Sequence, residues 1–210
     1  MNDMENRVIY KDLGLTEYAK AWDIQKDLHA QVCEINRYNR ELPLCEQHAN
    51  YNYLLFCEHP HVYTLGKSGK DNNLLVNEEF LKQKGASFFR IDRGGDITYH
   101  GPGQIVGYPI FNLEHFGIGV KKYIFNIEEA IINTLAFYGI RSERLEGATG
   151  VWLDTNVPGK TRKICAIGVK VSRLVTMHGF AFNVNTNLDY YNYINPCGFI
   201  DKGVTSMERE

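Results

Sequence analysis

Hydrophobic residues recur at helical spacing in two stretches of the chain. Over residues 16–39 apolar side chains follow one another mostly at steps of three or four, and over residues 120–138 they form a more regular stripe. Such steps place side chains on one face of an α-helix. Gly139 stands at a position where helices commonly end. The pattern therefore predicts two amphipathic helices over these ranges.

Short apolar or alternating runs elsewhere predict strands. They cover residues 53–57, 87–91, 96–100, 104–111, 150–154, 163–171 and 174–184. Pro109 has no N–H to donate, which predicts that its strand lies toward an edge of the sheet. Helices and strands do not alternate regularly along the chain. The expected fold class is therefore α+β, with a mixed or antiparallel central sheet and packed helices, in one domain spanning residues 1–210.

The strand at residues 96–100 lies between bends rich in glycine and proline. Alternation assigns Asp96, Thr98 and His100 to one face, and Ile97 and Tyr99 to the other. A polar face between flexible bends fits the wall of a pocket. It fits equally well a hairpin with a solvated face.

The run at residues 174–184 alternates as well. One face would carry His178, Phe180, Phe182 and Val184, and the other Val175, Met177, Gly179 and Ala181. The small side chains at positions 179 and 181 leave room for a ligand or for a close-packed neighbour.

The composition describes an ordinary globular protein. The chain has 210 residues, of which 44% are hydrophobic and 23% charged. No apolar run approaches the roughly 20 residues needed to cross a bilayer. The acidic, polar amino terminus fits neither a signal peptide nor a basic transit peptide, so the cytoplasm is the expected location. Five cysteines without a Cys-x-x-Cys pair argue against a disulfide scaffold or a zinc ribbon.

The charges are unevenly distributed along the chain. Residues 155–188 contain no Asp or Glu, and their cations are Lys160, Arg162, Lys163, Lys170 and Arg173. This segment predicts a basic surface that would dock an acidic partner or an anionic substrate group. A solvated basic strand edge is the alternative.

Two other motifs are weaker than they first look. Gly66-Lys67-Ser68 resembles the end of a phosphate-binding P-loop, but that motif needs a glycine where this chain has His61. Cys57, His59 and His61 would share one face of a regular strand, as zinc ligands could. Because Pro60 interrupts the ladder and no fourth ligand is nearby in sequence, a zinc site is not favoured.

Cys197 is the thiol in the most reactive setting. It stands in Asn195-Pro-Cys-Gly198, a tight turn with a backbone N–H beside the thiol. A cysteine with a pKa of about 8.5 is only a few per cent thiolate at neutral pH, and an ammonium within about 4–6 Å can lower that pKa enough to ionise half of it. Lys163 is a candidate for the ammonium. Cys165 would share the strand face of Lys163 and is a rival nucleophile.

Several motifs, in this order along the chain, resemble those of lipoyl(octanoyl) transferases. They are Glu58-His-Pro60, Val62-Tyr-Thr-Leu-Gly66, Arg93-Gly-Gly-Asp-Ile-Thr-Tyr-His-Gly-Pro-Gly-Gln104, Lys163-Ile-Cys-Ala-Ile-Gly168, His178-Gly-Phe-Ala-Phe-Asn-Val-Asn185 and Asn195-Pro-Cys-Gly198. The resemblance implies the α+β fold shared by the catalytic domains of lipoate- and biotin-protein ligases. It implies transfer of an octanoyl group from octanoyl-acyl carrier protein to a lysine of an apo lipoyl domain. The acceptors would be 2-oxoacid dehydrogenase complexes and the glycine-cleavage H protein, and the reaction would need no ATP, other cofactor, metal, nucleic acid or membrane.

The same resemblance implies roles for individual residues. Cys197 would form the acyl thioester, with Lys163 as its partner. The acyl and pantetheine site would be lined by Arg93, Gly94, Gly95, Asp96, Ile97, Thr98, Tyr99, His100, Ala166, Ile167, Gly168, Gly179, Phe180 and Ala181. His100 and His178 are expected to orient their neighbours by hydrogen bonds.

Two other functions compete with this one. An ATP-dependent lipoate-protein ligase has a similar Gly-Gly-x-x-x-Tyr-His segment, but that family typically continues with an aspartate where this chain has Gly101. A non-catalytic protein that binds lipoyl domains or acyl carriers could also keep the fold. Retention of both Cys197 and Lys163 argues against the second alternative.

Overall fold

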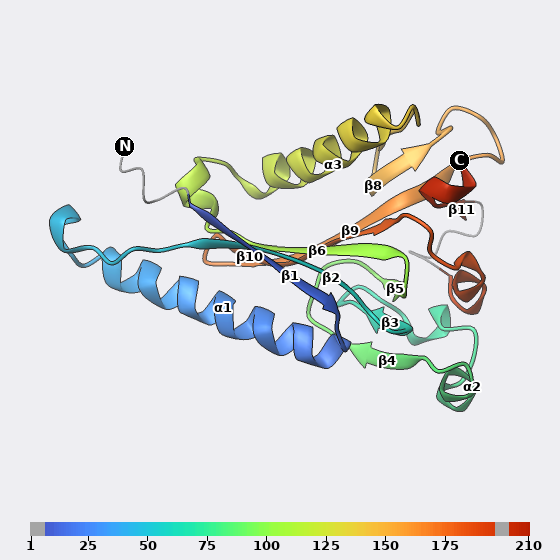
Figure 1. Cartoon of the computed structure of the whole chain (residues 1–210), viewed down its shortest axis with the longest axis horizontal. Coiled ribbons are helices and arrows are strands. Elements are labelled where there is room, and N and C mark those ends of the chain that lie inside the picture. Colours follow the sequence, from blue (N-terminus) through green and yellow to red (C-terminus); the bar gives the residue numbers. More distant parts are fainter. Residues whose placement is uncertain (1–6, 196–201) are drawn as a thin grey trace.

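Two long helices cover the two sides of a large sheet. The computed structural model of the protein describes residues 7–195 and 202–210. In Figure 1, α1 (Tyr18–Asn39) runs along one side of the sheet and α3 (Val120–Phe137) along the other. Both helices occupy the predicted ranges, and Gly139 follows α3 with a φ of 79°, the left-handed conformation that ends many helices. None of the helices in the described ranges is long and apolar enough to span a membrane.

The large sheet is mixed. Its strands are β1 (Val8–Leu15), β2 (Asn52–Glu58), β6 (Gln104–Ile110), β7 (Glu143–Leu145), β8 (Ala148–Leu153), β9 (Arg162–Ser172), β10 (Val175–Asn183) and β11 (Gly203–Val204). Their order is β1-β2-β6-β10-β9-β8-β7, and β11 pairs with β9. The β1–β2 and β9–β11 pairs are parallel, and the other pairs are antiparallel. This sheet and its helices confirm the predicted α+β class.

A smaller sheet lies next to the large one, at the lower right of Figure 1. It contains β4 (Ser87–Arg90), β3 (Val62–Leu65) and β5 (Ile97–His100) in that order, and the short helix α2 (Glu78–Gln83) precedes β4. The hydrophobic pattern does not predict β1, β3, α2, β7 or β11. These elements are short, or in the case of β1 mostly exposed, so they carry little periodic signal.

β6 lies inside the large sheet, between β2 and β10, so its predicted edge position is wrong. The ladder between β6 and β10 stops at the pair Gly107–Phe180. Beyond it, the Pro109 carbonyl accepts a hydrogen bond from the hydroxyl of Thr176 at 2.8 Å. Because the N and C=O of a strand residue point to the same side, the Pro109 nitrogen also faces this interruption. A proline is tolerated here because no ladder needs its N–H.

A left-handed residue in β10 accounts for the interruption. His178 has a φ of 61°. Phe180 and Phe182 pack with α3 residues such as Leu135, whereas the imidazole of His178 lies beside Trp22 of α1, with ring centroids 6.5 Å apart. The prediction that His178 shares a face with these phenylalanines is therefore wrong. One left-handed residue breaks the two-residue alternation of the strand.

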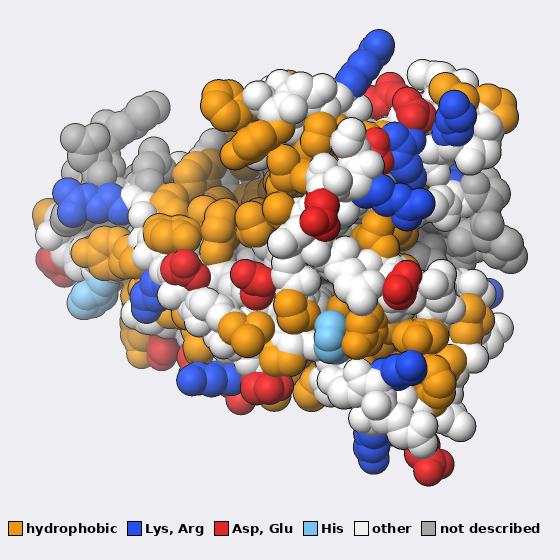
Figure 2. All heavy atoms as spheres, turned by 45° about the vertical axis from the view of Figure 1, so that its right-hand side comes forward, with side chains coloured by type: hydrophobic (Ala, Val, Ile, Leu, Met, Phe, Trp, Pro, Cys, Tyr) orange, Lys and Arg blue, Asp and Glu red, His pale blue; other side chains and the backbone are white. Residues whose placement is uncertain are grey.

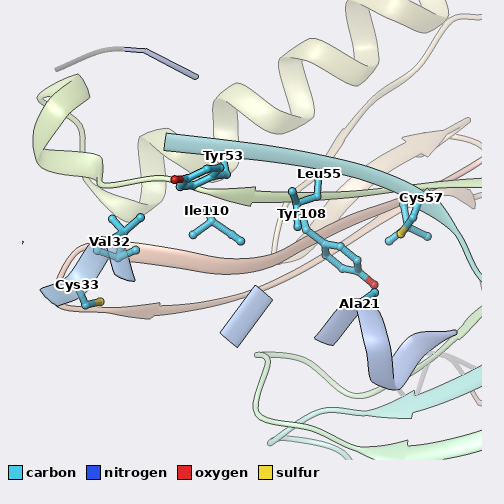
Figure 3. Packing of buried hydrophobic residues seen from close by; sticks show 10 residues of the cluster. Ala21, Val32, Cys33, Tyr53, Leu55, Cys57, Tyr108 and Ile110 are labelled. Atoms are coloured by element: carbon cyan, nitrogen blue, oxygen red, sulfur yellow. The ribbon is translucent and has the colours of Figure 1, made fainter. Parts of the chain in front are cut away.

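A buried apolar cluster holds α1 on the sheet, as Figure 3 shows. Its members are Ala21, Val32, Cys33, Tyr53, Leu55, Cys57, Val106, Tyr108, Ile110 and Val175. Leu55 is fully buried, and truncation of such a leucine to alanine costs about 2–5 kcal/mol. This packing brings the start of α1 next to β5, where the rings of Tyr18 and His100 stack with centroids 6.1 Å apart.

Candidate active site

A cavity of about 440 Å³, lined mostly by apolar surface, lies between β5 of the small sheet and β9 and β10 of the large sheet. This volume is in the range of roughly 300–1,000 Å³ that is usual for small-molecule sites. The predicted residues that line it are Arg93, Gly94, Gly95, Asp96, Ile97, Thr98, His100, Lys163, Ala166, Ile167, Gly168, Gly179, Phe180 and Ala181. Residues 93–100 are thus brought to one cavity with the paired strands β9 and β10, which follow about 60 residues or more later in the chain.

Tyr99 does not line the cavity. It is fully buried on the opposite face of β5, where its ring centroid lies 5.3 Å from that of Tyr63. The alternation of the strand explains this position, since it assigns Tyr99 and His100 to opposite faces. The resemblance, which carried over the whole segment, does not distinguish the two faces.

Glycines allow the wall segment to approach β9 closely. The Gly94 N–H donates to the Val169 carbonyl at 2.9 Å, and a Cβ at Gly168 would lie 2.9 Å from the Gly94 carbonyl oxygen. Arg93 is buried, and its guanidinium donates to the carbonyl of Thr64 at 2.7 Å and to the hydroxyl of the same residue at 3.0 Å. This segment therefore joins the small sheet to the large one.

His100 is a neutral imidazole with its hydrogen assigned to Nδ1. Gln104 donates through Nε2 to the Asn183 side chain, so its Oε1 is the atom that accepts from His100 Nδ1, at 2.8 Å. Burial, the largest effect, lowers the pKa of His100 to about 3. His100 Nε2 is therefore left as an acceptor.

His178 and Lys170 both donate to the carboxylate of Asp92. His178 Nε2 lies 2.9 Å from Asp92 Oδ1, and Lys170 Nζ lies 2.6 Å from Oδ2. Burial lowers the pKa of His178 to about 4, so the imidazole is neutral at pH 7. Burial also acts to raise the pKa of Asp92, but the hydrogen bonds from Lys170 and His178 outweigh it and bring that pKa to about 2. The expectation that His178 orients a neighbour fits this arrangement.

Lys163 lies in the cavity wall at the start of β9. Its Nζ donates to the Thr149 carbonyl at 3.1 Å and lies 4.4 Å from the ring centroid of Trp152. A Cβ at Gly150, which has a φ of 125°, would lie 3.4 Å from Lys163 Cε. The neighbouring strand β8 therefore shapes the space that the lysine side chain occupies.

Cys197 lies outside the described residues, and the chain on both sides of it is anchored. Before it, the Asn195 N–H donates to the Asn73 carbonyl at 2.8 Å. After it, Val204 pairs with Lys163 in the parallel ladder of β11 and β9. The described residues that follow Cys197 in the chain therefore lie beside Lys163.

Cys165 does not face the way its spacing from Lys163 predicts. The register of β8 and β9 pairs Trp152 with Lys163 but Val151 with Cys165, so β9 carries one extra residue between them. Cys165 is fully buried near α3 residues such as Leu135, and burial raises the pKa of its thiol far above the ordinary value. Since the thiolate is the reactive form, the structure argues against Cys165 as the rival nucleophile.

The acid-free segment does not form a single basic surface, so that prediction is wrong. Arg162 pairs with Asp154 at 2.5 Å, and Lys170 pairs with Asp92 at 2.6 Å. Arg173 follows β9 at the end opposite Arg162. Figure 2 shows positive and negative side chains intermixed across the face in view.

Cys57, His59 and His61 do not converge on one point. His59 Nε2 bonds to the hydroxyl of Tyr108 at 2.7 Å, whereas His61 Nδ1 bonds to that of Tyr99 at 2.7 Å. Across residues 7–195 and 202–210, no group of three or more His, Cys, Asp or Glu side chains is arranged to hold a metal ion.

Comparison with known families identifies the chain. The model of the lipoyl protein ligase A/B catalytic domain matches residues 17–210. The chain belongs to this family.

Similar proteins are named for their activity. Proteins named octanoyltransferase from Parabacteroides distasonis and Cytophaga hutchinsonii are each 56% identical to the chain. The matches cover 96% and 97% of the chain, and 87% and 83% of those proteins. These relatives confirm the resemblance to lipoyl(octanoyl) transferases, and the chain is an acyltransferase.

Solved structures support the fold. The bipartite lipoate protein ligase of Thermoplasma acidophilum superposes with a TM-score of 0.60 at 18% identity, over 91% of this chain and 66% of that one. LipL1 of P. falciparum, in complex with lipoate, gives 0.59 at 18% identity, over 94% and 54%. At these identities the likeness shows the fold alone, and it confirms the predicted fold of lipoate-protein ligase domains.

Sequence reasoning missed several residues that build the site of this acyltransferase. Asp92 holds His178, and Glu128 of α3 is 8% exposed and accepts the Gly150 N–H at 3.0 Å. Tyr191 lines the cavity. Glu128 carried a signal, because it occupies a position on the apolar stripe of its helix, where an acid is buried only with partners. Asp92 adjoins the glycine motif, but its partner is set by tertiary structure alone.

Proposed function

We propose that this acyltransferase moves an octanoyl group from octanoyl-acyl carrier protein, through a thioester on Cys197, to a specific lysine of apo lipoyl domains. The acceptors are the lipoyl domains of 2-oxoacid dehydrogenase complexes and the glycine-cleavage H protein. The names of the relatives and the apolar cavity support this substrate. Burial of the methylene groups of an octanoyl chain, at about 0.8 kcal/mol each, would contribute on the order of 5 kcal/mol to binding.

The pairing of Val204 with Lys163 is the observation that carries the proposal. It anchors the chain beside Lys163 seven residues after Cys197, and Asn195 is anchored two residues before it. An ammonium near a thiol favours the thiolate, which is the nucleophilic form. Lys163, in the wall of the cavity, supports this assignment.

In the first half-reaction, the Cys197 thiolate attacks the carbonyl carbon of the octanoyl thioester. The bond from that carbon to the carrier sulfur breaks. The departing thiolate takes a proton from the Lys163 ammonium and leaves as a free thiol. The octanoyl group is then a thioester on Cys197, and Lys163 is neutral.

In the second half-reaction, the neutral amine of the acceptor lysine attacks the Cys197 thioester. Neutral Lys163 takes one proton from the attacking nitrogen as a general base. The carbon–sulfur bond breaks, which leaves an amide on the acceptor, the Cys197 thiolate and the Lys163 ammonium. The starting pair is restored, and the activated donor makes ATP and other cofactors unnecessary.

Intact-mass measurement after mixing with octanoyl-acyl carrier protein tests the proposal. Wild type is expected to gain one octanoyl group, and Cys197→Ser is expected to gain no thioester. Cys45→Ser, which removes an exposed thiol, is the matched control and is expected to behave as wild type. Lys163→Ala is expected to slow both half-reactions.

The same experiment separates the competing functions. Absence of any adduct on wild type, with transfer that requires ATP, would identify a ligase. Absence of both adduct and transfer would identify a binding protein. An unchanged transfer rate in Cys197→Ala would contradict the thioester mechanism.

A further inference from the structure

Asp96 lines the cavity and accepts two hydrogen bonds through its carboxylate. Oδ1 accepts from the Ile97 N–H at 2.7 Å, and Oδ2 accepts from Asn73 Nδ2 at 2.5 Å. Two donors on the two sides of one side chain require two acceptor oxygens. A carboxylate supplies both, whereas a carboxamide supplies one. The proposed reaction makes no use of this carboxylate.

Asn73 connects Asp96 to the segment before Cys197. The carbonyl of Asn73 accepts from the Asn195 N–H at 2.8 Å. Next to this pair, Leu74 and Ile194 form an antiparallel bridge and pack in one apolar cluster, with Ile194 buried. The chain at Asn195 is therefore held against residues whose position depends on Asp96.

We infer that Asp96 is a positioning residue for the thiol of Cys197. Through Asn73 it holds the main chain at Asn195, two residues before the thiol. Two residues of chain span at most about 7 Å, so a displacement of Asn195 is expected to change the approach of the thiol to Lys163. The inference deepens the proposed function and rests on it, because it takes Cys197 as the residue that is acylated.

Direct participation of Asp96 as an acid or base is the competing explanation, because its side chain lines the cavity. The double variant Asp96→Asn/Asn73→Asp distinguishes the two roles. The amide at position 96 would still accept from the Ile97 N–H and would donate to the carboxylate at position 73. The hydrogen bond returns with its direction reversed, whereas an acid or base at position 96 is lost.

The test measures the single-turnover rate at which octanoyl-acyl carrier protein acylates Cys197, in wild type, both single variants and the double variant. In Asp96→Asn the amide NH₂ groups of positions 96 and 73 face each other, and in Asn73→Asp two carboxylates do. Each single variant is therefore expected to react about five- to tenfold more slowly. The double variant is expected to return to within about twofold of wild type. Asp12→Asn is the matched control. Asp12 accepts from the Gly14 N–H at 2.8 Å on β1, away from the cavity, and this variant is expected to react at the wild-type rate.

A second readout separates positioning from lost stability. The rate at which iodoacetamide alkylates Cys197 is expected to fall in the single variants and to recover in the double variant. The reaction is measured at a temperature at which each variant is still folded, as established from its thermal unfolding curve. Cys45, which is exposed, serves as the internal reference in the same molecule.

Acylation at the wild-type rate in both single variants would overturn the inference and leave the proposed function standing. A double variant no faster than the single variants would overturn it as well, in favour of a direct role for the carboxylate. Absence of a Cys197 adduct on wild type would reject the proposed function and this inference together.

Discussion

The imidazole of His178 donates to the carboxylate of Asp92 at 2.9 Å, across 86 positions of sequence. This bond ties the segment before β5 to the left-handed residue of β10. Lys170 occupies the other carboxylate oxygen at 2.6 Å. The three side chains therefore hold the glycine-rich wall of the cavity against the large sheet.

Replacement of Asp92 by asparagine is expected to loosen that wall. The amide can accept from Lys170, but its NH₂ group would then face the His178 Nε2–H. Loss of one hydrogen bond to a charged group costs about 1–3 kcal/mol, so the free energy of unfolding is expected to fall by that amount and KM for the acyl donor to rise. Urea denaturation and steady-state kinetics measure the two effects. Asp71→Asn is the control, because the Asp71–Arg90 pair is exposed and contributes at most about 1 kcal/mol.

Acid is expected to destabilise the fold through His178. Its pKa is about 4 in the folded protein and about 6.5 when unfolded, so the unfolded chain binds more protons between these values. The contribution of His178 to stability is therefore complete above pH 6.5 and is lost as the pH falls through 4, by on the order of 3 kcal/mol. His178→Gln removes this titrating group and is expected to make the slope shallower in urea denaturation, while the slope due to His100, whose pKa is also lowered, remains. An equally steep slope in the variant would contradict the assignment.

Gly150→Ala is expected to damage both the fold and the Lys163 environment. The φ of Gly150 is 125°, and a Cβ there would lie 2.5 Å from the Cys165 carbonyl oxygen and 3.4 Å from Lys163 Cε. Strain and overpacking together are expected to cost about 2–4 kcal/mol and to slow acylation of Cys197. Gly159→Ala is the matched control, with a φ of 74° and open space around a Cβ. It is expected to cost about 1 kcal/mol with the acylation rate unchanged; equal effects of the two variants would refute the steric argument.

Alanine at Gly179 and at Gly107 is expected to have unequal effects. A Cβ at Gly179 would collide with the Gly107 carbonyl oxygen and would lie 2.7 Å from Pro109 Cδ, so backbone must move. A Cβ at Gly107 would instead collide with the far edge of the Phe180 ring, which can turn. Thermal unfolding is therefore expected to show the larger loss for Gly179→Ala, about 2–3 kcal/mol. Gly107→Ala is expected to act mainly on octanoyl transfer, because Phe180 lines the cavity. The opposite order of stabilities would contradict this explanation.

Much of the fold could be predicted because its signals are local. The apolar stripes of α1 and α3 and the alternation of β5 are properties of neighbouring residues. The assignment of Ile97 and Tyr99 to one face and of His100 to the other needs only a regular strand. Ile97 and Tyr99 pack in one buried apolar cluster, whereas His100 stacks on Tyr18. The grouping of residues 93–100, 166–168 and 179–181 came from the family resemblance, since no local pattern joins them.

The remaining errors concern features that depend on a partner strand. Pro109 is tolerated in the interior because β10 turns away from it, and His178 changes sides because of one left-handed φ. Cys165 leaves the face of Lys163 because β8 pairs out of step with β9. None of these features leaves a periodic trace in its own segment. The basic surface fails for a similar reason, because the acidic partner of Lys170 lies 78 positions away.

The position of β10 has a consequence for the order in which the protein can form. Among the described strands, β1-β2-β6 and β9-β8-β7 meet only through β10, which the ribosome delivers after all of them. Until Asn183 has been synthesised, β6 and β9 each present an open edge, a ready template for pairing with another chain. Partial chains that stop before Val175 are therefore expected to aggregate. They are also expected to show no binding of the acyl donor, because β10 forms part of the cavity wall.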